Sequence, residues 1–295
     1  MWRRIILYRF QIDRVVRVPL FVALAVSAAV VLLVVCFLVL ESADALRAIG
    51  PWRFVSDASW HPTRFADTGQ FNLMPIVWGT LWVTVGAVLV AAPLAFLMAL
   101  YLYFFAAPRR ARAVRSLLGL LAGIPSVVYG LWGLTVLVPW ISRWQPPGAS
   151  LLAGILILAL MILPTIALLT DAAFQATPKA SADAAAAAGL SRWGALRAVV
   201  WPPARSGVVA ALVLGTGRAL GETMAVLMVC GNVVRTPSSL FDPIRTLTAN
   251  IALEMAYAMD LHRSALFVTG LMLAVAVGVM VLLASLLKER DPYAA

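Results

Sequence analysis

Charged residues are scarce in this chain, and lysine is nearly absent. Only 12% of the 295 residues are charged, and the two lysines are Lys179 and Lys288. A phosphate-cradling P-loop needs a Gly-Lys pair, whereas Pro178 and Leu287 precede these lysines. We therefore expect no cofactor in this chain, and any ATP that drives it to be bound by another subunit.

Histidine and cysteine are equally rare, with two of each. His61 and His262 have no cysteine or acidic cluster at ligand spacing, so no metal site is expected. Cys36 and Cys230 both lie in apolar segments, which favours small buried thiols over a disulfide framework. No Ser/His/Asp set falls within one pocket, so the sequence predicts a protein that is not an enzyme.

Hydrophobic residues make up 63% of the chain and are gathered in long uncharged runs. A membrane-spanning helix needs about 18 or more consecutive apolar residues. Five uncharged runs exceed that length: 18–40, 68–108, 116–142, 144–170 and 264–287. With the segment around Arg218, the sequence predicts an all-α integral membrane protein with six transmembrane helices.

The net charge of +10 is distributed unevenly between the two sides of this predicted bundle. Fifteen basic residues fall on the side that holds both termini, seven fall on the other, and Arg218 lies within the membrane. Positive residues favour the cytoplasm, so we expect both termini to be cytoplasmic. The basic charge is thus interpreted as a topology signal in a lipid bilayer, and no nucleic-acid partner is expected.

These boundaries divide the chain into a cytoplasmic N-terminus at 1–18, a first span at 19–40, an external loop at 41–71 and a transmembrane domain at 72–290. That domain includes a cytoplasmic segment at 178–203. The expected helices within it cover about 74–104, 116–140, 151–170, 207–231 and 264–287. Three glycines and Pro125 in the second of these helices predict close packing or a break.

Arg218 and Glu222 are the only charged residues between Arg205 and Arg235. Charges inside a membrane helix are expensive and mark a functional site by default. Their four-residue spacing predicts one helix face on which they neutralise each other. We interpret the pair as part of a substrate path; the alternative is a static bridge that only holds helices together.

The cytoplasmic segment 178–203 predicts two short helices. An alanine-rich helix follows Pro178, Gly189 ends it, and a second helix is stopped by Pro202 and Pro203. Such a pair makes a compact protrusion with small side chains, which suits a closely approaching partner. The alternative is an interfacial hairpin without a partner.

The spacing in this segment resembles the "EAA" loop of ABC-importer permeases. Asp183, Ala184, Ala185, Gly189 and Pro202 match that loop, with Asp183 in place of the usual glutamate. The resemblance implies that these residues form the coupling element that docks into a groove of an ATPase subunit.

Two further strings, "LLAGIPSVVYGLWG" at 120–133 and "GRALGETMAVLMVCGN" at 217–232, resemble permeases of the high-affinity phosphate importer, of the PstC type. The resemblance implies a type I ABC-importer permease in a bacterial inner membrane. It also implies a homologous second permease of the PstA type, two ATPase subunits that bind ATP and magnesium, and a periplasmic phosphate-binding protein.

Three alternatives stay open. Sulfate and molybdate permeases carry a similar "RALGE", and the planar donor fork of Arg218 suits any of these oxyanions. A secondary transporter that works alone would need no ATPase. A membrane scaffold that transports nothing would leave Arg218 and Glu222 without a role.

Overall fold

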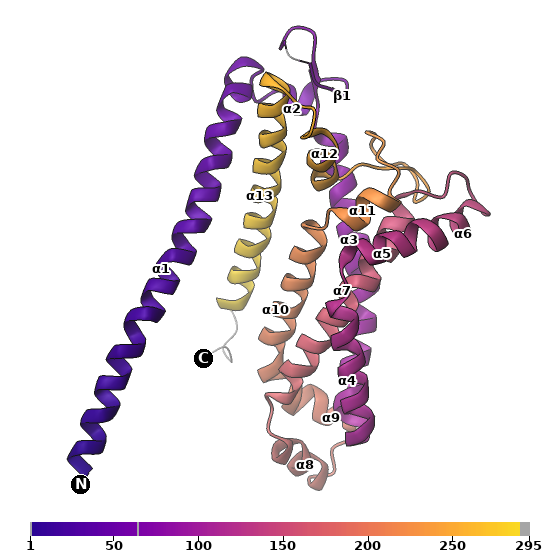
Figure 1. Ribbon diagram of the computed structural model, residues 1–295. Helices are drawn as coiled ribbons and strands as arrows, with labels where there is room; N and C mark the ends of the chain where they lie inside the picture. The colour runs from indigo at the N-terminus through magenta and orange to yellow at the C-terminus, as the bar shows by residue number, and fades with distance from the viewer. Residues whose placement is uncertain (1, 64, 290–295) are drawn as a thin grey trace.

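The computed structural model describes residues 2–63 and 65–289 and is almost entirely helical (Figure 1). The helices are α1 (Trp2–Ala48), α2 (Arg53–Ser56), α3 (Met74–Leu100), α4 (Pro108–Gly123), α5 (Ser126–Trp132), α6 (Val138–Ser142), α7 (Leu151–Gln175), α8 (Lys179–Ala187), α9 (Arg192–Ala195), α10 (Trp201–Leu220), α11 (Met224–Val229), α12 (Leu247–Glu254) and α13 (Asp260–Glu289). Three π-helical turns, at Tyr101–Phe105, Gly133–Leu137 and Leu196–Val200, extend or join them. Two short antiparallel strands, β1 (Trp60–His61) and β2 (Gln70–Phe71), form a hairpin.

Five helical stretches of the described chain are long and apolar enough to cross a membrane. They are Arg17–Ala48, Met74–Phe105, Leu151–Gln175, Arg192–Leu220 and Asp260–Leu286. The pair Pro108–Gly123 and Ser126–Ser142 passes the same test together but is bent by 88°. The six expected spans are therefore found when this bent pair counts as one broken span, and 68–108 holds the single long helix that the sequence predicts.

Helix α7 lies at the centre of the bundle. In its most apolar window 67% of the residues are buried, against 33% for α3 and none for α1. Alanines at positions 87, 91, 95 and 99 of α3 are fully buried. Their spacing of four places them on one helix face, where the small side chains let α3 approach α7 closely.

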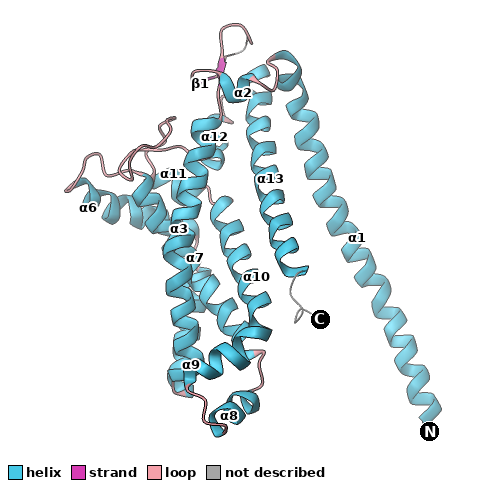
Figure 2. Ribbon diagram, turned by 180° about the vertical axis from the view of Figure 1, so that it is seen from behind, coloured by secondary structure: helices cyan, strands magenta, loops and turns pink. Residues whose placement is uncertain are grey.

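Helix α1 packs mainly against α13, at the end of the molecule that carries the β hairpin (Figures 1 and 2). Ser264 Oγ donates to the Glu41 carbonyl at 2.6 Å and accepts from the Ala45 N–H at 3.0 Å. Phe37 and Phe267 meet edge to face, 5.5 Å apart. Below this contact the two helices diverge, and the apolar side chains of α1 stay exposed, as expected for lipid contact.

Two of the predicted helices are broken, and in both the observed ends differ from the predicted ones. The expected helix 116–140 is interrupted because Ile124 is extended (φ −65°, ψ 130°), and Pro125 disfavours helical geometry in the residue before it. The Tyr129 hydroxyl donates to the Leu121 carbonyl across this break at 2.8 Å. The expected helix 207–231 is wrong at both ends, because α10 begins at Trp201 and ends at Leu220.

The predicted stop at Pro202 and Pro203 is also wrong. Both prolines lie in the first turn of α10, directly after a π-helical turn, and the helical path runs through them. The π-helical turn Leu196–Val200 precedes them, and the Trp201 N–H bonds to the Leu196 carbonyl five residues back. This wider turn joins α9 to α10 without ending the helical path.

Candidate substrate path and coupling segment

Arg218 lies in the last turn of α10 and is half-buried. Its Nη1 donates to Thr165 Oγ1 on α7 at 3.3 Å. The guanidinium is also close enough to act electrostatically on the Tyr129 phenol of α5. Arg218 therefore faces the contact between three spans, as expected for an intramembrane charge.

Glu222 lies two residues beyond the end of α10. Its Oε1 accepts from the Ala225 N–H at 3.0 Å, and its backbone carbonyl accepts from Thr248 Oγ1 at 2.7 Å. Within the described residues no ion pair joins Glu222 to Arg218, so the predicted neutralisation is wrong. The reason is that the helix ends at Leu220, and Glu222 no longer lies one turn above Arg218 on the same face.

The two broken spans meet at α5 and α11. A Cβ at Gly130 would lie 3.0 Å from the Ala225 Cα, and one at Gly133 would lie 2.8 Å from Val229. The predicted close packing is confirmed for Gly130 and Gly133 but is wrong for Gly123, where an added Cβ would meet nothing within 4 Å. The packing of α5 against α11 holds the break that follows Gly123 next to the break that precedes α11.

The 178–203 segment forms the protrusion that the sequence predicts (Figure 1). Gly189 has φ +81°, a left-handed conformation that ends α8 at low strain only for glycine. Of the matched residues, Ala184 is exposed and Ala185 is buried, while Asp183 lies in α8 with its side chain outside the described part of the structure. Among the α8 side chains that the structure describes, the exposed ones are all alanines, at positions 180, 184, 186 and 187.

The second half of this segment is anchored to the bundle. Leu196 and Val200 pack in a buried cluster with Ala99 of α3 and Phe174 of α7. Arg192 lies over the Phe105 ring, 4.7 Å from its centre. This buried cluster connects the second half of the segment to the ends of α3 and α7.

A cluster of polar side chains at the hairpin end is absent from the sequence predictions. The buried carboxylate of Glu254 accepts from Trp60 Nε1 at 2.9 Å and from Arg245 Nη1 at 2.6 Å, and it lies 2.9 Å from His262 Nε2. We call these four residues the Glu254 cluster. A cavity of about 500 Å³ opens beside it. The one available signal was a lone carboxylate in the apolar stretch 247–259.

The Gly-Asn pair that follows α11 has a structural role. Gly231 (φ +84°) and Asn232 (φ +56°) are both left-handed and reverse the chain. The Asn232 carbonyl then accepts from Arg245 Nε at 2.9 Å. A Cβ at Gly231 would lie 2.8 Å from Pro243 Cβ, so this position requires glycine.

His, Cys, Asp and Glu side chains of the described residues form no group that could hold a metal ion.

This chain is similar in sequence to known transport proteins. A family model described as "Binding-protein-dependent transport system inner membrane component" matches residues 91–290. The chain is 36% identical to the "Probable ABC transporter permease protein YqgH" of Bacillus subtilis, over 83% of this chain and 80% of that protein. It is also 36% identical to the "Phosphate transport system permease protein PstC" of Mesorhizobium japonicum, over 79% and 76% of the two chains.

Solved structures share the fold at lower identity. One chain of a bacterial alginate ABC transporter, in complex with an alginate pentasaccharide-bound periplasmic protein, has a TM-score of 0.60 at 17% identity, covering 90% of this chain and 94% of that one. One chain of the MetNI methionine ABC transporter, in an inward-facing conformation, has a TM-score of 0.59 at 19% identity, covering 73% and 94%.

Proposed function

Because the chain belongs to the family of binding-protein-dependent transport system inner membrane components, we propose that it is a permease subunit of an ATP-driven importer of inorganic phosphate. Relatives with the PstC name cover most of both chains and support phosphate as the transported ion. The geometric observation that carries the proposal is the position of Arg218. Its guanidinium lies among three spans, and the carboxylate of Glu222 is engaged elsewhere.

A guanidinium that is not paired with a carboxylate suits the binding of an oxyanion on its way through the membrane. Arginine presents a planar fork of donors that matches phosphate, and its charge offsets the free energy that the anion loses on leaving water. Thr165 lies within hydrogen-bonding distance of the same guanidinium and supplies a hydroxyl beside it. In our proposal the anion takes the place of this weak, 3.3 Å hydrogen bond as it passes.

The partners follow from the surfaces that the chain leaves open. Val127, Val128 and Leu131 of α5 and Met224 of α11 are apolar and exposed beside the breaks. We propose that a homologous second permease, of the PstA type, covers this face and completes the path. A periplasmic phosphate-binding protein would deliver the ion at the hairpin end, near the Glu254 cluster.

The proposed motor is a pair of ATPase subunits that bind ATP and magnesium and dock on the 178–203 segment. We propose that both chain termini are cytoplasmic; for the N-terminus this is supported by α1, which begins at the same end of the molecule as α8 (Figure 1). ATP binding would move α8 and α9, and the buried cluster around Leu196 would carry that movement to α3 and α7. Switching between outward- and inward-facing states needs different contacts in each state, and the two breaks are positions where such contacts could change.

Replacement of Arg218 by glutamine tests the site. We expect Arg218→Gln to reduce uptake of radiolabelled phosphate in cells by at least about tenfold, the equivalent of one lost charge-assisted hydrogen bond. Arg143→Gln is the matched control, because Arg143 is an exposed arginine outside the packed spans. Wild-type uptake by the Arg218 variant, with normal complex assembly, would refute the assigned role.

Labelled sulfate and molybdate, given to the same cells, test the choice of oxyanion. Uptake of either ion in preference to phosphate would reassign the substrate and leave the permease function intact.

Removal of residues 178–203 tests the proposed ATPase partner, since the ATPase should then no longer co-purify. A shortened chain that still transports without an ATPase would indicate a secondary transporter.

A further inference from the structure

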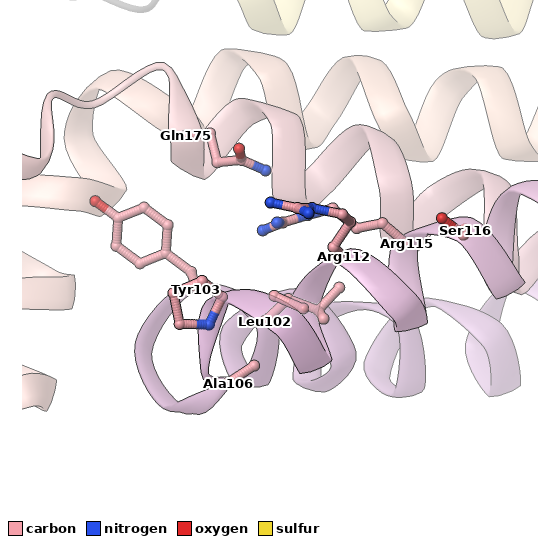
Figure 3. Close-up of a pocket in the computed structure, with 9 residues that line it drawn as sticks. Leu102, Tyr103, Ala106, Arg112, Arg115, Ser116 and Gln175 are labelled. Carbon is pink, nitrogen blue, oxygen red and sulfur yellow. The ribbon is translucent and has the colours of Figure 1, made fainter.

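A cavity of about 470 Å³ opens at the α8 end of the bundle, away from Arg218 and its neighbours. It lies between the π-helical turn after α3, the first half of α4 and the last turn of α7. Tyr103, Arg112, Arg115, Ser116 and Gln175 are its polar lining residues. Figure 3 shows Arg112 and Arg115 extending from α4 toward Gln175, with Tyr103 across the opening.

One of the two arginines is neutralised. Arg115 Nε and Nη2 donate to the two carboxylate oxygens of Asp171, at 2.7 and 3.1 Å, and Gln175 Nε2 donates to the same carboxylate at 2.6 Å. Asp171 is buried, and its oxygens are occupied by these donors. The carboxylate therefore has little capacity left to attract a further cation or to repel an anion.

The charge of the other arginine is not offset by a carboxylate. Arg112 is exposed at the cavity, and within the described part of the chain no hydrogen bond or ion pair satisfies its guanidinium. Ser116 adds a hydroxyl and Arg115 keeps donors that Asp171 does not use. The cavity thus combines a net positive charge with several hydrogen-bond donors, and no unpaired carboxylate lines it.

We propose that this cavity binds a phosphate group. The volume of about 470 Å³ is many times the roughly 10–15 Å³ of cavity that holds one water molecule, so a phosphate with part of its substituent fits. Guanidinium donors match phosphate oxygens in geometry and charge. In the topology proposed above, the cavity faces the cytoplasmic leaflet, where basic pockets between transmembrane helices bind anionic headgroups.

Two sources supply this chemistry: the headgroup of an anionic phospholipid, or free phosphate on the cytoplasmic side. The exposed leucines 117 and 120 continue from the cavity along α4 and offer an apolar surface to an acyl chain. The site is separate from the translocation path and does not depend on which ion the path carries.

The experiment uses the complete importer complex, purified with its partner subunits, in two arms. In the lipid arm, nanodiscs of phosphatidylcholine contain graded amounts of phosphatidylglycerol, and native mass spectrometry counts the phosphatidylglycerol that stays bound. In the phosphate arm, nanodiscs lack phosphatidylglycerol, and equilibrium dialysis measures bound radiolabelled phosphate. Every protein in that second arm also carries Arg218→Gln, which removes the contribution of the transport path.

The test variant is Arg112→Gln, and the matched control is Arg110→Gln. Both changes remove one positive charge from the same helix. Arg110 is exposed but does not line the cavity, so its replacement controls for the lost charge alone. We expect Arg112→Gln to weaken binding about tenfold, as for the loss of a charge-assisted hydrogen bond, while Arg110→Gln stays near wild type. A loss in the lipid arm identifies a headgroup, and a loss in the phosphate arm identifies free phosphate. Equal binding by the two variants in both arms would overturn the proposal.

Discussion

Replacement of Glu254 by glutamine should loosen the hairpin end of the molecule. The Glu254 carboxylate accepts from Trp60 Nε1 and Arg245 Nη1 and lies 2.9 Å from His262 Nε2. A carboxylate has two acceptor oxygens, whereas the glutamine amide turns one of them into a donor. That donor must then face Trp60 or Arg245, both of which donate.

The magnitude follows from the burial of the pair. The side chains of Glu254 and Arg245 are 9% and 18% exposed, and removal of one partner from a buried ion pair costs about 3–5 kcal/mol. Arg245 keeps two other acceptors, the Asn232 carbonyl at 2.9 Å and Asn250 Oδ1 at 3.0 Å. These remaining acceptors reduce the cost, so we expect a value at or below the bottom of that range, about 2–3 kcal/mol.

Thermal unfolding of the purified complex, followed by intrinsic fluorescence, measures this effect. A change of about 2–3 kcal/mol corresponds to a fall in Tm of roughly 3–5 °C for a chain of 295 residues. The control is Asp44→Asn, which neutralises an exposed carboxylate on α1 near the same end of the molecule. If Glu254→Gln shifts Tm no more than Asp44→Asn, the carboxylate does not hold the cluster together.

Two further substitutions test the interior packing. Gly130→Val should lower Tm and phosphate uptake together, since a Cβ would lie 3.0 Å from the Ala225 Cα; Gly119→Val, with open space around it, is its control and should change neither. Asp171→Asn should lower Tm by an amount equivalent to about 2 kcal/mol, because Arg115 loses a charged acceptor that is almost fully buried. An unchanged Tm for Asp171→Asn would show that Arg115 finds another acceptor.

The long spans could be predicted from hydropathy because apolar length is a local property. The helix from Met74 to Phe105, the span near 151–175 and the protrusion after Pro178 follow from runs, prolines and glycines in the sequence. The angle of the break at Pro125 could not be predicted, since hydropathy continues through it. Proline restricts Ile124, but the 88° bend depends on how α5 packs against α11.

The Glu254 cluster could not be predicted from the sequence because its members are far apart along the chain. Trp60 and Glu254 are separated by 194 positions, and each alone is an ordinary strand or helix residue. Only the packing of the hairpin against α12 and α13 brings them together. The pairing of Arg218 with Glu222 failed for the opposite reason: a spacing of four implies contact only while one helix continues through both residues.

The break between Arg218 and Glu222 bears on how an anion could pass. If one helix carried both residues, the carboxylate would compete with phosphate for the guanidinium at every transport event. In the observed arrangement Glu222 caps α11 through the Ala225 N–H, and Thr248 fastens its backbone to α12. Negative charge near a helix N-terminus is stabilising, which keeps this carboxylate away from Arg218. We infer that Glu222 maintains the break between α10 and α11 while Arg218 meets the ion. Glu222→Gln should therefore destabilise this break more than it changes which anions are transported.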